Sequence, residues 1–419
     1  MNKKILKYTA VLLALVLSAT AINVYAADKI TSCYETADWS VAGEYPLTPK
    51  SPEWASMSYT ECLEACEMPD DLLQNSSTEI LAEYVLTYPF LCDIMVFNNA
   101  EQAITHLSDT SNIFKEFFSR EDSKEILLKK YELLNVEYEL LTDVASDNPL
   151  EDSGYIKELF LQTYFAYCLK DLNHQDVKIL KQILNDKYAA KEGICENFSS
   201  SMLFYRFIQK DLNYVPAYII AENVSDLFEP TAVYSGAIGF VSSNETYISP
   251  NGVIYTVGTY MKYDRAPVCL RYKSGDYSDG EIKEIDTSLS NAHKSWTKIS
   301  SATARYNCHS YAWISTDSSN RYWLNNPDYY ANSKYFDCDG KNGSANAEDK
   351  IIIRASDTFN DGSGGTTNAL HSLIATSHGM SVTSIQTVSK LGECGVYEAP
   401  LFDMMIFYGG AYYNVYKSN

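Results

Sequence analysis

Helical patterning dominates the first half of the chain. Between Ser58 and Leu212 apolar residues recur at spacings of three and four, which places them on one face of a helix. Ser76 and Glu79 have the spacing of a capping box and mark a helix start. The residues that carry the period are Ile80, Leu81, Tyr84, Val85, Ile126, Leu127, Leu133, Leu134, Leu140, Leu141, Ile156, Leu159, Phe160, Tyr164, Val177, Leu180, Ile183 and Leu184. We therefore predict a helical accessory module over residues 27–215.

After Val215 the pattern becomes one of strands. Residues 246–249 and 253–257 are rich in β-branched and aromatic side chains, and Pro250-Asn251-Gly252 lies between them. An Asn-Gly pair between two such runs is typical of a β-hairpin. The stretch from Lys273 to Lys298 is acidic and polar, which indicates a loosely packed link. Residues 216–299 are thus predicted to hold a β-hairpin and a linker.

The last predicted domain covers residues 300–419. Its pattern is a helix near residue 308, a long loop and then short apolar runs typical of strands. The runs lie at 351–354, 371–376, 381–388 and 404–408. Helices first and strands last predict an α+β protein, with a helical module followed by a helix packed on an antiparallel sheet.

The first 26 residues have the order of a secretory signal peptide. Lys3, Lys4 and Lys7 precede an apolar run from Ala10 to Ala21, and Val24-Tyr25-Ala26 follows it. The run is too short to span a bilayer core of about 30 Å, and the later sequence has no apolar stretch of about 20 residues. We expect a mature protein that starts near Ala27, is secreted or held at the cell surface, and has no membrane span after signal removal.

The charge of the chain argues against polyanionic partners. The net charge is −21, and loss of the three signal lysines makes it −24. Between Ala27 and Ala100 there are 13 Asp and Glu residues against 2 Lys. Nucleic acid and anionic lipid would repel such a surface, so no nucleic-acid partner is expected. The 34 tyrosines are spread over the whole chain, which favours ordinary packing over a sugar-binding platform.

The cysteines do not have the spacing of a metal site. The ten include Cys62 and Cys66, four residues apart, but no Cys-x-x-Cys pair occurs. Structural zinc is therefore not expected, while disulfide pairing outside the cytoplasm is left open. The segments 337–343 and 357–365 resemble calcium loops in composition only, because their glycines do not have the spacing of such a loop. No metal or cofactor is predicted.

The strongest candidate for chemistry is Tyr306-Asn307-Cys308-His309-Ser310-Tyr311-Ala312-Trp313. Asn307 is a good N-cap, so Cys308 is expected in the first turn of a helix. Free N–H groups and the helix dipole there lower the pKa of a thiol, which favours the nucleophilic thiolate. Cys308 is therefore the predicted nucleophile.

A nucleophilic cysteine also needs a base, and the chain offers six histidines. His309 follows Cys308 on the same helix, about 100° round its axis, and so faces elsewhere. His371 opens a predicted strand, and alternation places it with Leu373 and Ala375 on the face that a helix would cover. His371 is the predicted base, with His378 as the alternative.

The order of these elements resembles a known enzyme core. A cysteine that begins a helix, a strand led by Asp349 and a strand opened by His371 are similar to NlpC-type and CHAP cell-wall peptidases, which are papain-like. The motif around Cys308 also resembles one found in a family of secreted proteins from Gram-positive bacteria. The resemblance covers about residues 301–397. It implies a papain-like fold and hydrolysis of an amide bond in proteins or peptidoglycan peptides, with Cys308 as nucleophile and His371 as base.

In papain-like enzymes a further polar residue orients the catalytic imidazole. Two residues after the histidine strand can fill that place here, Gln386 and Ser389. The segment from Val388 to Gly392 falls where papain relatives carry Asn-Ser-Trp-Gly, which aligns Ser389 with the orienting Asn. Serine is a poorer orienter than Asn, so both residues are carried as candidates.

Two alternative functions use the same residues differently. Buried and paired cysteines are common, so the core could serve a non-catalytic secreted or surface interaction protein as a scaffold. Cys195 lies in a segment that resembles the transglutaminase core, in which a cysteine on a helix precedes a strand. However, no histidine occurs between His174 and His293 to act as its base. A degenerate transglutaminase-like module is therefore the other alternative, and a secreted cysteine hydrolase is the leading prediction.

Overall fold

The computed structural model describes most of the chain after the predicted signal peptide. The described residues are 39, 43–97, 100–138, 154–192, 239–248, 254–262, 266–272, 277–320, 322–324, 326–331, 336–360 and 366–418. Their helices are η1 (Trp54–Ser56), α2 (Tyr59–Ala65), α3 (Asp70–Asn75), α4 (Thr78–Leu86), η2 (Leu91–Val96), α5 (Ala100–Thr110), α6 (Asn112–Ser119), α7 (Ser123–Leu133), α8 (Tyr155–Cys168), η4 (Leu169–Asp171), α9 (His174–Glu192), α11 (Asp279–Ala292), α12 (Cys308–Trp313), η6 (Pro327–Tyr329) and α13 (Leu401–Phe407). Their strands are β1 (Gly239–Ile248), β2 (Ile254–Lys262), β3 (Ala266–Tyr272), β4 (Thr297–Ser300), β5 (Tyr322–Leu324), β6 (Phe336–Lys341), β7 (Lys350–Asn360), β8 (Thr366–Ala375), β9 (Gln386–Lys390), β10 (Val396–Pro400) and β11 (Tyr412–Ser418).

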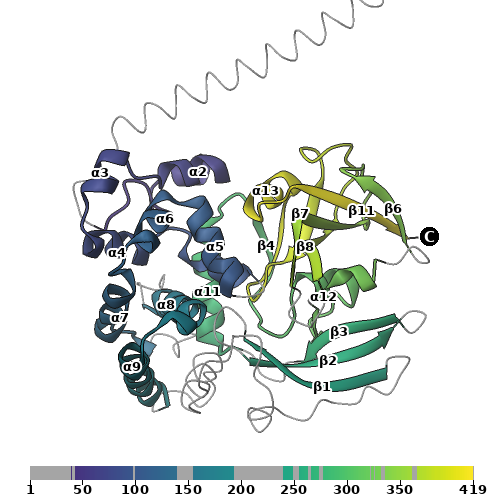
Figure 1. Ribbon diagram of the computed structural model, residues 1–419. Helices are drawn as coiled ribbons and strands as arrows, with labels where there is room; N and C mark the ends of the chain where they lie inside the picture. The colour runs from purple at the N-terminus through teal and green to yellow at the C-terminus, as the bar shows by residue number, and fades with distance from the viewer. Residues whose placement is uncertain are drawn as a thin grey trace, which may run out of the picture.

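Helices α2 to α9 form one side of the molecule and the strands form the other (Figure 1). This order confirms the predicted mixed fold, with helices first and an antiparallel sheet last. One detail of the prediction is wrong, because α4 is capped by Ser77, whose side chain accepts the Ile80 N–H, while Ser76 ends α3. No helix in the described residues is long and apolar enough to cross a membrane.

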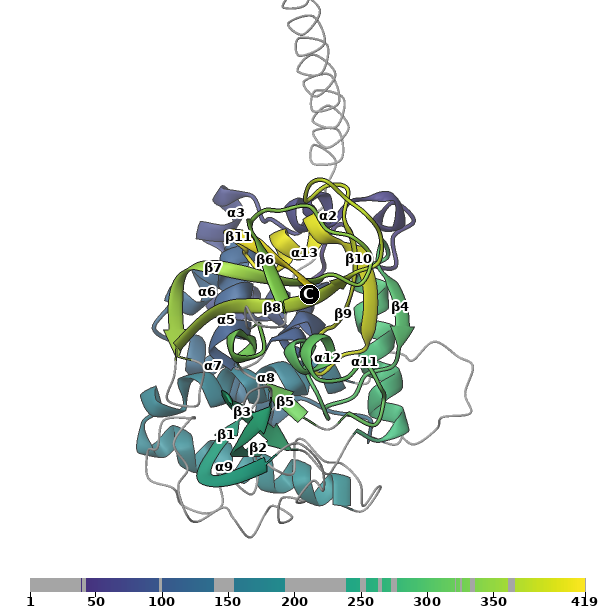
Figure 2. The ribbon, with the colours of Figure 1, turned by 90° about the vertical axis from the view of Figure 1, so that its right-hand side faces the viewer.

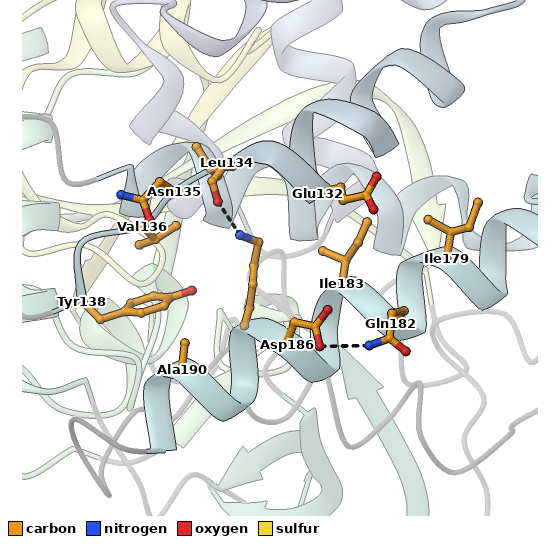
Figure 3. Close-up of a pocket in the computed structure, with 11 residues that line it drawn as sticks. Glu132, Leu134, Asn135, Val136, Tyr138, Ile179, Gln182, Ile183, Asp186 and Ala190 are labelled. Carbon is orange, nitrogen blue, oxygen red and sulfur yellow. Dashed lines mark hydrogen bonds between the residues drawn. The ribbon is translucent and has the colours of Figure 1, made fainter.

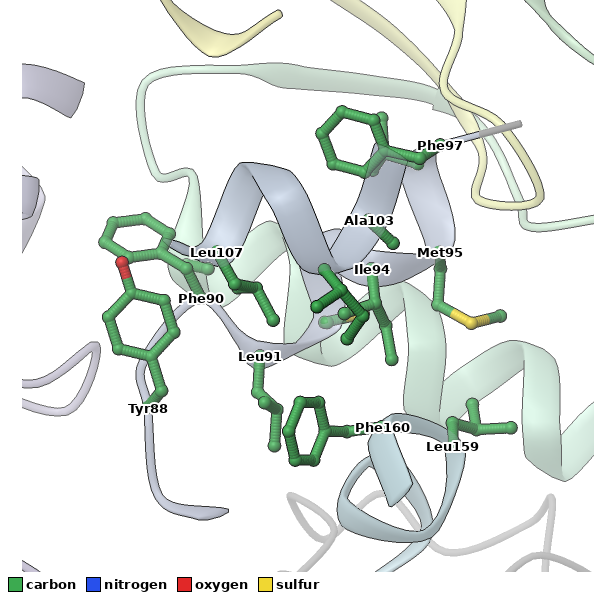
Figure 4. Packing of buried hydrophobic residues seen from close by; sticks show 14 of the residues in the cluster. Tyr88, Phe90, Leu91, Ile94, Met95, Phe97, Ala103, Leu107, Leu159 and Phe160 are labelled. Atoms are coloured by element: carbon green, nitrogen blue, oxygen red, sulfur yellow. The ribbon is translucent and has the colours of Figure 1, made fainter. Parts of the chain in front are cut away.

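The short 3₁₀-helix η2 is the hub of the helical half. All six of its residues are buried, because α5 and α8 pack against it and α11 contacts it as well. Figure 4 shows Leu91, Ile94 and Met95 pointing among Leu107, Leu159 and Phe160. An apolar run buried on every side suits a central element, since each face has a partner that removes it from water.

Two antiparallel sheets make up the strand half. Seven strands form the larger sheet in the order β4-β10-β9-β8-β7-β11-β6, and β1-β2-β3-β5 form the smaller one. The predicted hairpin is confirmed in its strands, since Ile248 of β1 pairs with Ile254 of β2. The Asn-Gly turn itself lies outside the described residues.

The larger sheet is covered on both faces. One face, which carries Ile351, Ile353 and Leu373, shares a continuous core with the helical half and α13. The other face, which carries Ile352, packs against Ala312 and Trp313 of α12. Figures 1 and 2 show α12 beside β8, with the smaller sheet beyond it. Between the pairs Lys350–Ile374 and Ile353–His371, where the register is continuous, each residue of β7 and β8 therefore has a defined face, and this decides what His371 and Ser372 can touch.

Two sequence expectations are wrong. The stretch from Lys273 to Lys298, expected to be a loose link, contains the helix α11, which Ser278 and Glu281 begin with a capping box and which buries Ile285 and Leu289 in the core. The run 404–408, expected to be a strand, belongs mostly to helix α13, which follows Pro400. Short apolar runs have no period of their own, so tertiary packing decides between helix and strand.

Candidate active site

Cys308 is the first residue of α12, as the sequence predicts. The Asn307 side chain caps the helix by accepting the Ser310 N–H at 3.1 Å. The same amide also fixes α12 to β5, since it accepts the Leu324 N–H at 3.2 Å and donates to the Leu324 carbonyl at 2.8 Å. Asn307 is fully buried, so loss of these bonds would leave polar groups without water. The cap therefore fixes the start of α12, and with it Cys308, against β5 of the smaller sheet.

The thiol of Cys308 lies where two strands of the sheet separate. Strands β8 and β9 pair only at Ile374–Val388 and Ala375–Thr387, and α12 packs against both strands. Burial raises the pKa of the Cys308 thiol to about 12, although the backbone N–H groups of Ser372 and His309 and the charge of Lys390 act to lower it. The expectation of a lowered pKa at the helix start is thus wrong for this conformation. Desolvation outweighs the N–H groups of a helix only six residues long.

His371 lies on β8 with the predicted alternation. It pairs with Ile353, while Ser372 pairs with Ile352, so His371 faces the core shared with the helices and Ser372 faces α12. The helices that cover His371 are therefore α13 and the helical half, so the expectation that the helix of Cys308 would cover this face of the strand is wrong. Burial lowers the pKa of His371 well below its ordinary value, and the nearby His309 lowers it further.

Two contacts fix the His371 ring. Its Nε2 atom is 3.0 Å from the Ser389 Oγ, and its face stacks on Tyr408 with ring centroids 4.0 Å apart. The Nδ1 atom is buried and has no hydrogen-bond partner in the described part of the chain. One ring nitrogen is therefore bonded to a hydroxyl and the other is buried without a partner, as is one ring nitrogen of His293 and one of His309.

Cys308 and His371 share Tyr408 as a neighbour, but no direct bond joins them in the described residues. No hydrogen bond between the thiol and the imidazole exists in the described residues, in which the Nδ1 atom is unpartnered. Tyr408 is close to both, since its ring stacks on His371 and its pKa is raised first by burial and then by the charge of the Cys308 thiolate. At neutral pH the raised thiol pKa and the lowered imidazole pKa give an uncharged pair.

The other sequence candidates are placed differently. Gln386 begins β9 opposite Pro400, and no hydrogen bond joins its side chain to His371 in the described residues. His378 is exposed, and its Nδ1 atom lies 2.9 Å from the Asn346 Oδ1. Between the two proposed orienters, Ser389 is thus the one in contact with the imidazole. Cys195 lies outside the described residues.

Sequence reasoning missed a buried polar group beneath α12. The Ser372 Oγ lies 2.7 Å from the His309 Nδ1 and accepts the Trp313 Nε1–H at 3.0 Å. Burial lowers the pKa of His309 to about 3, which keeps its ring neutral. The signal was present, because positions 309 and 313 share a helix face and position 372 alternates with His371. What the sequence could not give was the register that brings the two elements together.

Lys390 is a second residue that the sequence did not single out. Its buried ammonium donates to the carbonyls of Thr303, Gly392 and Cys394, and it lies 5.2 Å from the centroid of the Tyr306 ring. Three carbonyl acceptors compensate the desolvation of a buried cation. Its charge is one of the groups that lower the pKa of Cys308.

A cavity of about 330 Å³ lies elsewhere, between α9 and the end of α7 (Figure 3). Its lining includes Glu132, Tyr138 and Ile183 and no residue of α12, β8 or β9. Among the described residues no group of three His, Cys, Asp or Glu side chains could hold a metal ion. In the first calcium-like segment Asp339 binds Lys417, and part of the second lies outside the described chain.

In comparisons with family models, curated proteins and solved structures, nothing matches this chain. The assignment of a function therefore rests on the geometry of the chain's own residues.

Proposed function

We propose that this chain is an exported thiol hydrolase that cleaves an amide bond. Cys308 is the nucleophile, His371 is the general base and Ser389 orients the imidazole. The observation that carries the proposal is the His371 ring itself, whose Nε2 atom meets Ser389 while its buried Nδ1 atom has no partner among the described residues. His293 and His309 also have one bonded ring nitrogen and one buried nitrogen without a partner among the described residues, but the His371 ring is the one that stacks on Tyr408, a neighbour of the Cys308 thiol.

The proton path follows from this geometry. With Nε2–H donating to Ser389, Nδ1 carries the lone pair and accepts the Cys308 proton as sulfur attacks the substrate carbonyl. The thiol does not need to ionise beforehand, which suits its raised pKa. His371 then returns the proton to the leaving amine, and water hydrolyses the thioester with the same base. In this proposal the backbone N–H of Ser372, which interacts with the thiol, is the donor to the developing oxyanion.

The described conformation is the closed state of this site. Cys308 and His371 are both buried, and Tyr408 covers the imidazole. Substrate entry requires Tyr408 to move. The Tyr408 hydroxyl is buried and has no partner in the described residues, so its displacement breaks no hydrogen bond among them. Tyr408 is followed by Gly409, whose φ of 62° is in the left-handed region that favours glycine.

The substrate class of the proposal is a peptide, either in protein or in the stem of peptidoglycan. An acidic chain is a poor ligand for anionic wall polymers, so recognition would depend on the peptide rather than on bulk charge. The helical half serves as an accessory that supports the sheet through the shared core. Export is part of the proposal, and sequencing of the secreted protein should give a start near Ala27.

Release of amino groups tests the activity directly. Purified peptidoglycan and casein are incubated separately with the mature protein, with Cys308→Ala and with Cys338→Ala, which removes an exposed thiol far from His371 in sequence. We expect new amino groups from one substrate with the wild type and Cys338→Ala, and none with Cys308→Ala. Equal release by all three proteins would contradict the role of Cys308.

A non-catalytic surface protein is the second candidate, because a specific observation favours it. Burial shifts the pKa of Cys308 upwards and that of His371 downwards, which is opposite to a preformed thiolate–imidazolium pair. In that case the same core is a scaffold for binding. Failure of both substrates, together with equal Cys308 reactivity with and without His371, would favour this candidate.

A further inference from the structure

The turn between β9 and β10 is pressed against η2 of the helical half. The Glu393 N–H donates to the Met95 carbonyl at 2.9 Å. A Cβ on Gly392 would lie 2.4 Å from the Val96 carbonyl oxygen, so the two backbones are in direct contact. This is where a segment near residue 95 and a segment near residue 393 are joined.

One cysteine from each segment lies in this contact. Cys92 precedes Met95 by three residues, one turn of the 3₁₀-helix, so it lies on the same side of η2. Cys394 follows Glu393 directly. Both side chains are buried, and Cys394 is the first cause that raises the pKa of the Cys92 thiol, so the two thiols lie close together. The Cys92 thiol donates to the Ile285 carbonyl at 3.8 Å. The pKa of Tyr397 is raised mainly by burial, then by Cys394 and less by Cys92. Both thiols therefore lie close to the same hydroxyl.

We propose that Cys92 and Cys394 form a disulfide that joins the helical half to the sheet. A disulfide donor of the oxidised-glutathione class supplies the oxidation. One cysteine thiolate attacks the donor and releases one donor thiol, and the second thiolate then displaces the other. The Sγ–Sγ bond forms, two protons leave, and the two electrons reduce the donor to two thiols. Because both thiols are buried, exchange takes place before the contact between turn and η2 closes.

The bridge has two consequences for the sheet. It fixes the turn that follows Ser389 and Lys390, whose ammonium already binds the Gly392 and Cys394 carbonyls. It also occupies Cys394 and leaves Cys308 as a free thiol. The bridge does not depend on the proposed hydrolase activity, since it rests on the contact between η2 and the turn alone.

The experiment uses the full mature chain. The reduced protein is unfolded, refolded with oxidised glutathione, blocked with N-ethylmaleimide in denaturant and digested for mass spectrometry. We expect a linked peptide that contains Cys92 and Cys394, with Cys308 recovered as its maleimide adduct. The oxidised protein should unfold at a Tm about 4 °C higher than the reduced protein.

Two double variants keep the result interpretable. In Cys92→Ala/Cys394→Ala the Tm difference between oxidised and reduced protein should vanish, whatever the variant's own stability. In Cys62→Ala/Cys66→Ala, which removes two other buried cysteines, the difference should persist. Cys62 lies in α2 and Cys66 is its C-cap, and residues four apart along a helix have Cβ atoms too distant for a disulfide. Recovery of Cys92 and Cys394 as maleimide adducts after oxidation, or linkage of either one to another cysteine, would overturn the proposal.

Discussion

The His371 Nε2 atom lies 3.0 Å from the Ser389 Oγ, across two strands that have begun to separate. Ser389 is held by pairing with Tyr397 on β10, so the hydroxyl is offered from a fixed strand rather than from a loop. This contact fixes the plane of a buried imidazole and leaves Nδ1 without a partner among the described residues. A general base needs an orienting contact of this kind, and the stacking on Tyr408 separates His371 from His309, which makes a similar contact with Ser372.

Removal of the Ser389 hydroxyl should weaken the base. In Ser389→Ala we expect turnover, or the rate of Cys308 modification, to fall about tenfold or more, because the imidazole loses the bond that sets its tautomer. Gln386→Ala should change the rate less than about twofold, since its side chain does not contact His371. Thr387→Val, on the same strand and equally buried, is the matched control. A larger loss in Gln386→Ala than in Ser389→Ala would reverse the assignment.

Acid should destabilise the fold through its buried histidines. Burial lowers the pKa of His106 to about 4 and that of His309 to about 3, and it also lowers that of His371. The unfolded chain, with a pKa of about 6.5, takes up protons first, so stability is present above that pH and is lost as pH falls. Between pH 7 and pH 5 each of these histidines should lower the free energy of unfolding, measured with urea, by about 2 kcal/mol.

A pair of variants isolates the contribution of His106 to this loss of stability in acid. His106→Leu should reduce the loss of stability between pH 7 and pH 5 by about 2 kcal/mol. His378→Ala, which removes an exposed histidine, should leave that loss unchanged. If His106→Leu and the wild type lose the same free energy over this range, His106 is not held neutral by burial.

The contact between the β9–β10 turn and η2 can be tested at Gly392. Both Gly392 (φ 49°) and Gly340 (φ 77°) have a left-handed backbone, but only Gly392 has backbone atoms in the space of a Cβ. Gly340→Ala should therefore cost about 1 kcal/mol of conformational strain. Gly392→Ala should cost at least about 2 kcal/mol more, measured by chemical unfolding. Equal costs would mean that the turn is not pressed against η2.

Local signals in the sequence predicted local structure well. The Asn307 cap placed the start of α12, and alternation placed His371, Leu373 and Ala375 on one face of β8. The apolar run at 404–408 failed because five residues fit a strand or a helix equally, and Pro400 with the packing of Met404 decided for α13. Residues 273–298 are mostly polar, so the sequence did not indicate the amphipathic helix α11, which packs on the core through a few apolar residues.

The electrostatics of the site could not be predicted in the same way. A helix start lowers the pKa of a thiol that is exposed to solvent or lies near a positive charge. The burial of Cys308, which raises its pKa, depends on how α12 packs over the gap between β8 and β9. Tyr408, which follows α13, and Lys390 of β9 are distant in sequence from Cys308, and only the order of the strands makes them its neighbours. The hydrophobic period of a sequence predicts the face of a helix or strand on which a residue lies, but not which other element packs against that face.

The coupling of Cys308 to His371 is tested most directly by the rate at which iodoacetamide alkylates Cys308 in the native protein, followed by peptide mapping from pH 4 to pH 10. In the wild type we predict a rate that rises as His371 loses its proton, below pH 6.5, and then stays level to about pH 8, because the neutral imidazole accepts the thiol proton during attack. In His371→Ala the rate at pH 7 should fall at least about tenfold and should rise steadily with pH towards the thiol pKa of about 12. His378→Ala should behave as the wild type. Equal rates in the wild type and His371→Ala at pH 7, both rising as for an isolated buried thiol, would contradict the proposed hydrolase site.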